Sequence, residues 1–177
     1  DLLGRDPIKL DNAGMREWIS GQTVMVTGAG GSIGSELCRQ ILKFSPKRIV
    51  CLEQNEFALY RIVEEFKATT VQTEIIPVIA DIRNEIRMEH VMQMWRPGTV
   101  FHAAAYKHVP LVEANIFEGI RNNIFGTKNV AELSLEYGVS DFILISTDKA
   151  VRPINIMGAT KRWAELIVQN YASEAKS

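Results

Sequence analysis

The sequence predicts an α/β fold, a doubly wound parallel sheet with helices on both faces. Short apolar, β-branched runs alternate along the chain with segments of helical periodicity. The runs are almost continuously apolar, as strands buried on both faces require. Five such β-α units leave few arrangements other than right-handed crossovers within one sheet. The 177 residues, 46% of them hydrophobic, are enough for one domain with a core.

The first half of the chain predicts three strands that alternate with three helices. Residues 1–20 mix charge with glycine and proline and are expected to form a lead-in segment with one short helix, before a single domain over 21–177. The predicted strands are 23–28, 48–53 and 74–81, and the predicted helices are 32–44, 56–68 and 85–95. Pro77 places the third strand at an edge of the sheet or indicates a distortion, because proline cannot donate to the ladder.

The second half predicts a strand over 99–105, one long helix over 115–138, a strand over 141–147 and a helix over 158–173. Gly138 is expected to cap the long helix. In such sheets ligands bind beyond the carboxyl ends of the strands, at the switch point between the first and fourth strands. Every candidate residue below follows a strand end or faces that edge.

Composition excludes several classes of function. The net charge of -1 gives no electrostatic footprint for nucleic acid or for an anionic membrane surface. No signal peptide and no run of about 18 apolar residues is visible. No spacing of cysteine and histidine predicts a metal site. Cys38 and Cys51 lie in apolar segments and suit a reducing compartment as buried thiols. Because the chain begins at Asp1, it is expected to be a piece of a longer protein.

A glycine-rich loop, "TGAGGSIGSE", joins the first predicted strand to the first helix. The first glycine permits a tight turn, the middle two let the backbone approach a pyrophosphate, and the last lets the helix pack close to the sheet. The helix N-terminus adds free N–H groups and a partial positive charge. The residues expected to contact a cofactor here are Gly28, Gly30, Gly31, Ser32, Ile33 and Gly34.

Later strand ends complete a predicted dinucleotide site. Glu53 closes the second strand, about 20 residues after the loop, where a carboxylate binds an adenosine ribose and repels a 2′-phosphate, which favours NAD over NADP. Asp81, next to Ile82, is placed to reach an adenine amino group. The small side chains of Ala103, Ala104 and Ala105 leave room for a dinucleotide beside the sheet.

These motifs resemble a known family. The loop over 27–34, "ADI" (80–82), "HAAA" (102–105), "NIFGT" (123–127) and a Ser/Thr strand followed by a lysine helix resemble the extended short-chain dehydrogenase/reductases. "AAAYKHVPLVE" (103–113) and "STDKAVRP" (146–153) resemble the nucleotide-sugar 4,6-dehydratases of polysaccharide biosynthesis, whose usual substrate is UDP-N-acetylglucosamine. "DLLGRDPI" (1–8) is similar to the segment that leads into the catalytic domain of that group's long, membrane-attached members.

The resemblance implies a Rossmann-type fold, NAD as cofactor and a UDP-sugar as substrate. It also implies a homo-oligomer, a cytoplasmic position for this domain and a parent chain at the cytoplasmic face of the inner membrane. The resemblance covers nearly the whole chain, but the chain is expected to lack the C-terminal portion that binds the sugar nucleotide in this family. The isolated chain is therefore expected to be inactive or weakly active.

Such a dehydratase oxidises C4 of the sugar, removes the C5 proton, expels the C6 hydroxyl as water and returns the hydride to C6. By resemblance, Thr147 contacts the C4 oxygen, Asp148 protonates the leaving C6 hydroxyl and Lys149 takes the C5 proton. Asp148 and Lys149 would need shifted pKa values for these tasks near neutral pH, which a shared, partly desolvated cavity could provide. Lys107 and His108 are implied to shape the sugar side, and Asn123 to orient the helix lysine through water.

The position that usually holds the catalytic tyrosine is occupied by Met157. Lys161 stands four residues later, on the same helix face, and is expected to bind the nicotinamide ribose. Three interpretations remain: a pseudoenzyme, a member with a mutated base, or a reassigned hydroxyl. Because long-form dehydratases also resemble this chain in carrying methionine there, reassignment to Thr147 is favoured. A 4-epimerase or other extended reductase, and a non-catalytic dinucleotide-binding sensor, stay as alternatives.

Overall fold

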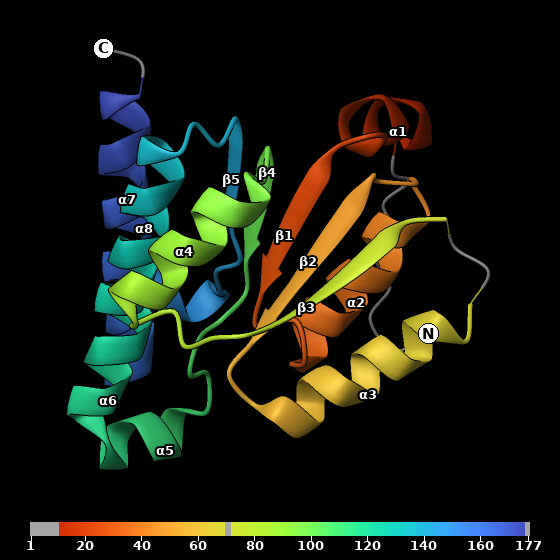
Figure 1. The fold of residues 1–177 in the computed structure, drawn as a ribbon. Helices are drawn as coiled ribbons and strands as arrows, with labels where there is room; N and C mark the ends of the chain where they lie inside the picture. Colours follow the sequence, from red (N-terminus) through yellow and green to blue (C-terminus); the bar gives the residue numbers. More distant parts are fainter. Residues whose placement is uncertain (1–10, 70–71, 176–177) are drawn as a thin grey trace.

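The computed structural model describes residues 11–69 and 72–175, and it confirms the predicted α/β class. Five parallel strands form one sheet in the order β3-β2-β1-β4-β5 (Figure 1). Their bounds are β1 Thr23–Thr27, β2 Arg48–Glu53, β3 Glu74–Ile79, β4 Thr99–His102 and β5 Asp141–Leu144. The segment 1–8, for which a resemblance was noted, lies outside the described residues.

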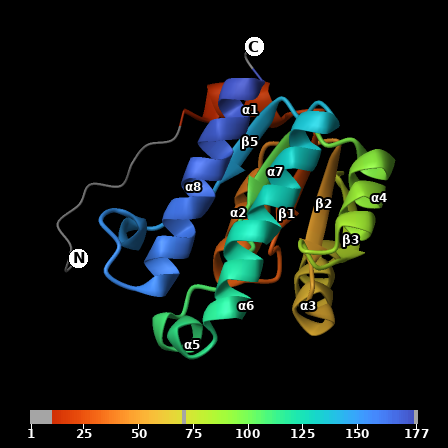
Figure 2. The same cartoon turned by 90° about the vertical axis from the view of Figure 1, so that its left-hand side faces the viewer.

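Helices cover both faces of the sheet, as the apolar strands require. α1 Asn12–Ile19, α2 Ser32–Leu42 and α3 Glu56–Lys67 pack on one face, and α4 Glu85–Trp95 and α7 Thr127–Glu136 on the other. α8 Ile156–Glu174 lies beside α7 (Figure 2). Val24 and Val26 point into the first core and Met25 into the second, since successive strand side chains alternate between faces. Among the described residues, no helix is long and apolar enough to cross a membrane.

The predicted switch point is confirmed. β1 pairs with β2 on one side and with β4 on the other, so the loops that leave β1 and β4 diverge to opposite faces at the carboxyl edge. β3 pairs with β2 alone among the described strands, which agrees with an edge position for Pro77. The helix α1 contributes Ile19 to the core, and Trp18 Nε1 donates to Asp141 Oδ2 at 3.0 Å. The boundary between lead-in and domain stays a prediction.

The long helix predicted over 115–138 is present as a continuous helical rod, but it contains a π turn that was not predicted. α5 Val109–Ala114 precedes it, and the rod itself runs through α6 Ile116–Ile120, a π-helix Arg121–Gly126 and then α7. The wider π turn brings Asn122, Asn123 and Gly126 inward together, and all three are buried. Gly138, with φ +70°, follows the end of α7 in the left-handed conformation expected of a cap.

Element ends also differ from the predictions. β3, β4 and β5 stop two or three residues early, because the residues after Ile79, His102 and Leu144 leave the ladder to form the loops that carry the site. α8 begins at Ile156 rather than 158, because Asn155 caps it by accepting a hydrogen bond from Gly158 N at 2.7 Å.

Candidate active site

The glycine loop turns sharply off β1 and passes against the loop that follows β4. Gly28 has φ +69°, and a Cβ at this position would lie 2.8 Å from the Ala104 backbone. A Cβ at Gly34 would collide with the Gly28 carbonyl oxygen, so α2 can pack this close only with glycine there. α2 begins at Ser32, and the first N–H groups of a helix have no partner within it. The loop thus presents donors at the carboxyl edge.

Glu53, at the end of β2, is fixed beside this loop. Its carboxylate accepts hydrogen bonds from Gly30 N at 3.1 Å and Asn55 N at 3.0 Å. Asn55 in turn caps α3 by accepting from Ala58 N at 3.0 Å. An ionised carboxylate has about four acceptor sites, so capacity remains for the hydroxyls of a ribose. The Glu53 carboxylate is therefore held beside the glycine loop by two backbone N–H groups, and its role in binding a ribose stays a prediction.

A cavity of about 200 Å³ lies under the loop, between the ends of β1, β2, β3 and β4. It brings together many of the residues predicted to bind the cofactor: Gly28, Gly31, Glu53, Ile82, Ala103, Ala104 and Ala105. Gly30 and Ser32 instead line a separate polar cavity of about 340 Å³ on the other side of the loop. Ile33 is half exposed. The glycine loop therefore lies between two cavities, and a ligand bound along the loop would touch both.

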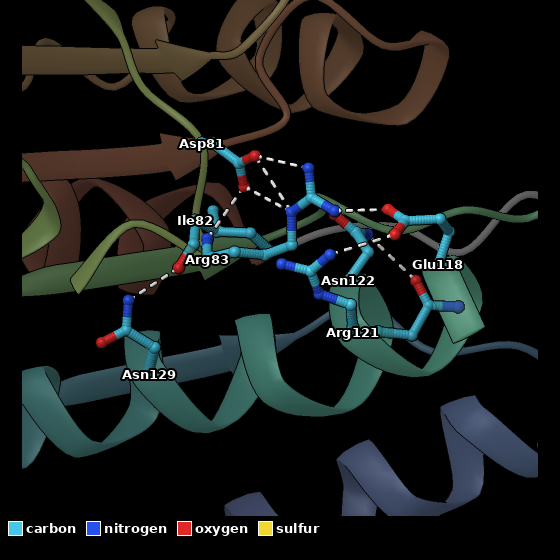
Figure 3. A network of polar contacts seen from close by, with 8 residues as sticks. Asp81, Ile82, Arg83, Glu118, Arg121, Asn122 and Asn129 are labelled. Carbon is cyan, nitrogen blue, oxygen red and sulfur yellow. Dashed lines mark hydrogen bonds and ion pairs between the residues drawn. The ribbon is translucent and has the colours of Figure 1, made fainter.

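Asp81 lies next to the first cavity, and its carboxylate is engaged by Arg83. The backbone N–H of Arg83 donates to Asp81 Oδ1 at 2.9 Å, and its guanidinium donates to both carboxylate oxygens (Figure 3). These bonds hold the pKa of the Asp81 carboxyl below its ordinary value. The acid expected to meet an adenine is thus ionised and ordered by a residue that the sequence analysis did not single out.

Lys107 and His108 border a second cavity, of about 390 Å³, between the loop after β4 and the helices α5 and α6. Ala105 and Tyr106 line both this cavity and the one beneath the glycine loop. The two hollows are therefore neighbours along one loop. This placement agrees with a substrate-side role for Lys107 and His108, which stays a prediction.

The buried side chain of Asn123 links two segments of the protein by hydrogen bonds. Its side chain accepts from Tyr106 N at 2.8 Å and donates to Tyr106 O and Thr160 Oγ1, each at 3.0 Å. The side chain is buried, and Asn122 donates to it at 3.1 Å. Asn123 thus ties the loop after β4 directly to the lysine helix, whereas its expected action through water stays a prediction.

His102 was missed by the sequence analysis. It is buried at the end of β4, where its ring nitrogens lie 2.7 Å from Thr27 Oγ1 and 2.9 Å from Thr127 Oγ1. Burial, followed by the charge of Lys161, lowers the pKa of His102 to about 3. The neutral ring therefore joins β1, β4 and α7 by hydrogen bonds. A histidine in an apolar strand was the available signal for it.

Lys161 is buried in α8, and its Nζ donates to the backbone carbonyl of Ile145 at 2.7 Å. Burial lowers the pKa of Lys161 to about 8, and Glu165 partly opposes this effect. Met157, one turn earlier, is 2% exposed and can neither give nor take a proton. The lysine is therefore held at the end of β5, directly before the "STDK" segment, with no acidic hydroxyl at the usual position.

Asp148 and Lys149 lie on a 3₁₀ turn, Asp148–Ala150, after β5, and Thr147 caps the start of this turn. Thr147 Oγ1 donates to Asp148 Oδ1 at 2.9 Å, and Lys149 Nζ lies 3.4 Å from the same oxygen. Gly158 of α8 supports the turn closely, since a Cβ there would collide with the Lys149 carbonyl oxygen. Three side chains that can exchange protons are therefore connected in one cluster, two residues beyond the Ile145 carbonyl that binds Lys161.

The pKa of Asp148 is shifted in the direction opposite to that expected of an acid. The Thr147 hydroxyl, and then the Lys149 ammonium, donate to its carboxylate and lower its pKa. The side chain of Asp148 is 89% exposed, so desolvation, which raises the pKa, is outweighed by these hydrogen bonds. In the present structure Asp148 is a carboxylate at neutral pH, and the expected raised pKa is not found.

The chain is similar to several known proteins. Residues 24–177 match a family described as "Polysaccharide biosynthesis protein". The capsular polysaccharide biosynthesis protein CapD of Staphylococcus aureus is 54% identical over 96% of the chain and 28% of that relative. A UDP-N-acetylglucosamine 4,6-dehydratase (inverting) of Campylobacter jejuni is 35% identical over 79% of the chain and 40% of that relative. The chain thus spans less than half the length of these curated relatives.

Solved structures share the fold. The X-ray structure of Pen from Bacillus thuringiensis has a TM-score of 0.83 and 32% identity, over 90% of this chain and 48% of that one. DesIV of Streptomyces venezuelae, a dTDP-glucose 4,6-dehydratase solved with NAD bound, has a TM-score of 0.77 and 21% identity, over 85% of this chain and 52% of that one. The second similarity shows the fold alone.

Proposed function

The chain belongs to the polysaccharide biosynthesis protein family, and on that premise we propose that the full-length protein is an NAD-dependent 4,6-dehydratase of a UDP-N-acetylhexosamine, with UDP-N-acetylglucosamine as substrate. The observation that carries the proposal is the hydrogen-bonded cluster of Thr147, Asp148 and Lys149 next to the buried Lys161. Dehydration needs proton transfer at three atoms, O4, C5 and O6, and this cluster offers a group for each.

The residues at the carboxyl edge fit a dinucleotide. Gly28 and Ala104 approach so closely that any side chain would fill the space, Glu53 is oriented for a ribose, and α2 directs its N-terminus at the loop. When bound, NAD would accept the hydride from C4 and return it at C6. Lys161 would hold the nicotinamide ribose and contribute its positive charge near O4.

The hydrogen bond between Thr147 and Asp148 supports a route for the O4 proton that needs no tyrosine. As C4 is oxidised, Thr147 Oγ1 takes the O4 proton and passes its own to the Asp148 carboxylate, 2.9 Å away. Asp148, now protonated, later gives that proton to the C6 oxygen as water leaves. Lys149, after its ammonium has released a proton to solvent, takes the C5 proton during elimination and returns it to C5 at the end. The low pKa of Asp148 then suits its first task, because it must begin as a carboxylate.

The proposal extends to the surroundings of the domain. We expect the full-length protein to be a homo-oligomer attached to a membrane, with this domain on the cytoplasmic side. Trp163 and Leu166 are exposed along a groove of about 310 Å³ between α7 and α8, which supports contact with another subunit. The 177-residue chain alone is expected to turn over feebly, because it spans a minority of its relatives' length.

The proposed function is tested by incubating full-length protein with UDP-N-acetylglucosamine and NAD and weighing the sugar nucleotide by mass spectrometry. We expect loss of one water. Lys149→Ala and Thr147→Val should each slow this loss by about 100-fold or more, whereas Lys67→Ala, a change of an exposed lysine on α3, should not. A stereoisomer of unchanged mass would establish an epimerase instead, and an unchanged sugar nucleotide would contradict the proposed substrate.

A further inference from the structure

Arg83 lies at the centre of a polar network between the loop after β3 and the helix α6 (Figure 3). Its Nε lies 3.0 and 2.9 Å from the two carboxylate oxygens of Asp81, and its Nη2 lies 2.6 Å from Oδ2. Its Nη1 donates to Glu118 Oε2 at 2.6 Å, and Glu118 also accepts from Arg121 at 3.2 Å. The Arg83 side chain is 24% exposed. A partly buried guanidinium that donates several hydrogen bonds within a network interacts more strongly with its carboxylate partners than an ordinary surface ion pair does.

The same loop is attached to the helical rod at two points that do not involve the Arg83 side chain. The Ile82 carbonyl accepts from Asn129 Nδ2 at 2.7 Å. The Ile82 side chain packs against Gly126, where an added Cβ would lie 2.6 Å from Cδ1. Both contacts are buried, so the loop stays in place when Arg83 is changed. Variants at Arg83 are therefore expected to fold.

The two ends of the network border different cavities. Ala80 and Ile82, on either side of Asp81, line the cavity beneath the glycine loop. Glu118 and Gly119 line the larger cavity that also contains Lys107 and His108, and Glu118 is absent from the lining of the first. Arg83 thus connects the wall of the proposed cofactor site to the wall of a second site.

We propose that Arg83 is a positioning residue that couples these two cavities, so that dinucleotide affinity depends on Glu118. The inference rests on the proposed function, because it takes the first cavity as the NAD site. Without Glu118, the Arg83 guanidinium loses its attachment to α6, and the Asp81 carboxylate loses part of what orders it. Because coupling free energies are reciprocal, a ligand of the second cavity that displaces Glu118 and thereby changes dinucleotide affinity has its own affinity changed by the dinucleotide by the same factor.

The test measures NAD binding to full-length protein by calorimetry, without any sugar nucleotide. Glu118→Ala is expected to weaken NAD binding by about 3- to 10-fold, although Glu118 does not border that cavity. Arg83→Gln should weaken binding by a similar factor, and the double variant no further than Arg83→Gln alone. For Glu118→Ala, simple electrostatics predicts the opposite change, tighter NAD binding, because removing a carboxylate favours an anionic pyrophosphate.

Glu132→Ala provides the control, since Glu132 is an exposed acid on α7 paired with Lys128, and it should leave NAD affinity unchanged. Unchanged or tighter NAD binding by Glu118→Ala, or additive effects of the two substitutions, would overturn coupling through Arg83 while leaving the proposed function intact. Failure of the unsubstituted protein to bind NAD would overturn the proposed cofactor and this inference together. The two failures are therefore distinguishable.

Discussion

At the scale of single residues, the proposed mechanism assigns the task of one acidic hydroxyl to a hydrogen-bonded pair, Thr147 and Asp148. Met157 is buried and inert, whereas Thr147 donates to Asp148 at 2.9 Å. The direction of the Asp148 pKa shift separates two roles for this carboxylate. An acid that acts only at O6 must start protonated, but a group that first receives the O4 proton must start ionised, and the lowered pKa favours the second.

Asp148→Asn tests this relay, because it changes the predicted step. If Asp148 receives the O4 proton, the substitution should slow oxidation at C4 itself by about 100-fold. Lys149→Ala is the matched variant, since it should leave C4 oxidation fast and block only the elimination. Single-turnover absorbance of reduced nicotinamide measures the first step directly. Rapid C4 oxidation in Asp148→Asn would restrict Asp148 to the later step and refute the relay.

Lys161 predicts a pH dependence of stability. Its pKa is lowered to about 8 by burial, against about 10.4 in an unfolded chain. Between these values the unfolded state binds more protons, so the contribution of Lys161 to stability increases as pH rises. From pH 7.5 to pH 9.5 the free energy of unfolding of the unsubstituted protein should rise by about 2 kcal/mol relative to Lys161→Met.

Urea unfolding at both pH values measures this difference. Lys128→Met removes an exposed, paired lysine from α7 and should track the unsubstituted protein in its pH dependence. If the free energy of unfolding changes with pH in the same way for Lys161→Met and the unsubstituted protein, burial does not lower the pKa of Lys161.

At the scale of elements, the glycine loop is shaped by close approach as well as by backbone conformation. Gly21 and Gly28 have nearly the same φ, +72° and +69°. A Cβ at Gly21 has nothing within 4 Å, whereas one at Gly28 lies 2.8 Å from Ala104. The difference between the two positions isolates the contact between the loops of β1 and β4.

Gly21→Ala should therefore cost about 1–2 kcal/mol of unfolding free energy from backbone conformation alone. Gly28→Ala should cost about 1–3 kcal/mol more, because the loop after β4 must move, and it should also weaken NAD binding. Chemical denaturation and calorimetric NAD titration of both variants check this pair. Equal losses of stability, or unchanged NAD affinity in Gly28→Ala, would show that the close approach does not shape the cofactor site.

The elements that could be predicted from sequence are those fixed by local pattern. Apolar runs that alternate with segments of helical periodicity predict the strands, and Pro77 predicts that the third strand lies at an edge of the sheet. Both signals can be read from residues that are close together in the sequence. The π turn could not be predicted, because its wider spacing is held by tertiary contacts of Asn123 with Tyr106 and Thr160. Arg83 was missed for the same reason, since its partner Glu118 is distant in sequence.

At the scale of the whole molecule, the sheet collects groups that are far apart in the chain at one edge. The glycine loop, Glu53 and the alanines after β4 enclose one cavity, and Lys107 and His108 border the next. The residues 147–149 were singled out from their motif, but the protonation state of Asp148 was not predicted. Protonation depends on solvent exposure, which is a property of the assembled fold.

The central claim is that this edge moves a hydride from C4 to C6 of a UDP-N-acetylhexosamine. Its most direct test is to supply full-length protein with UDP-N-acetylglucosamine that carries deuterium at C4 and to locate the label by NMR. The account predicts a dehydrated product with a ketone at C4 and deuterium at C6. Deuterium retained at C4, whether the configuration there is unchanged or inverted, would contradict it.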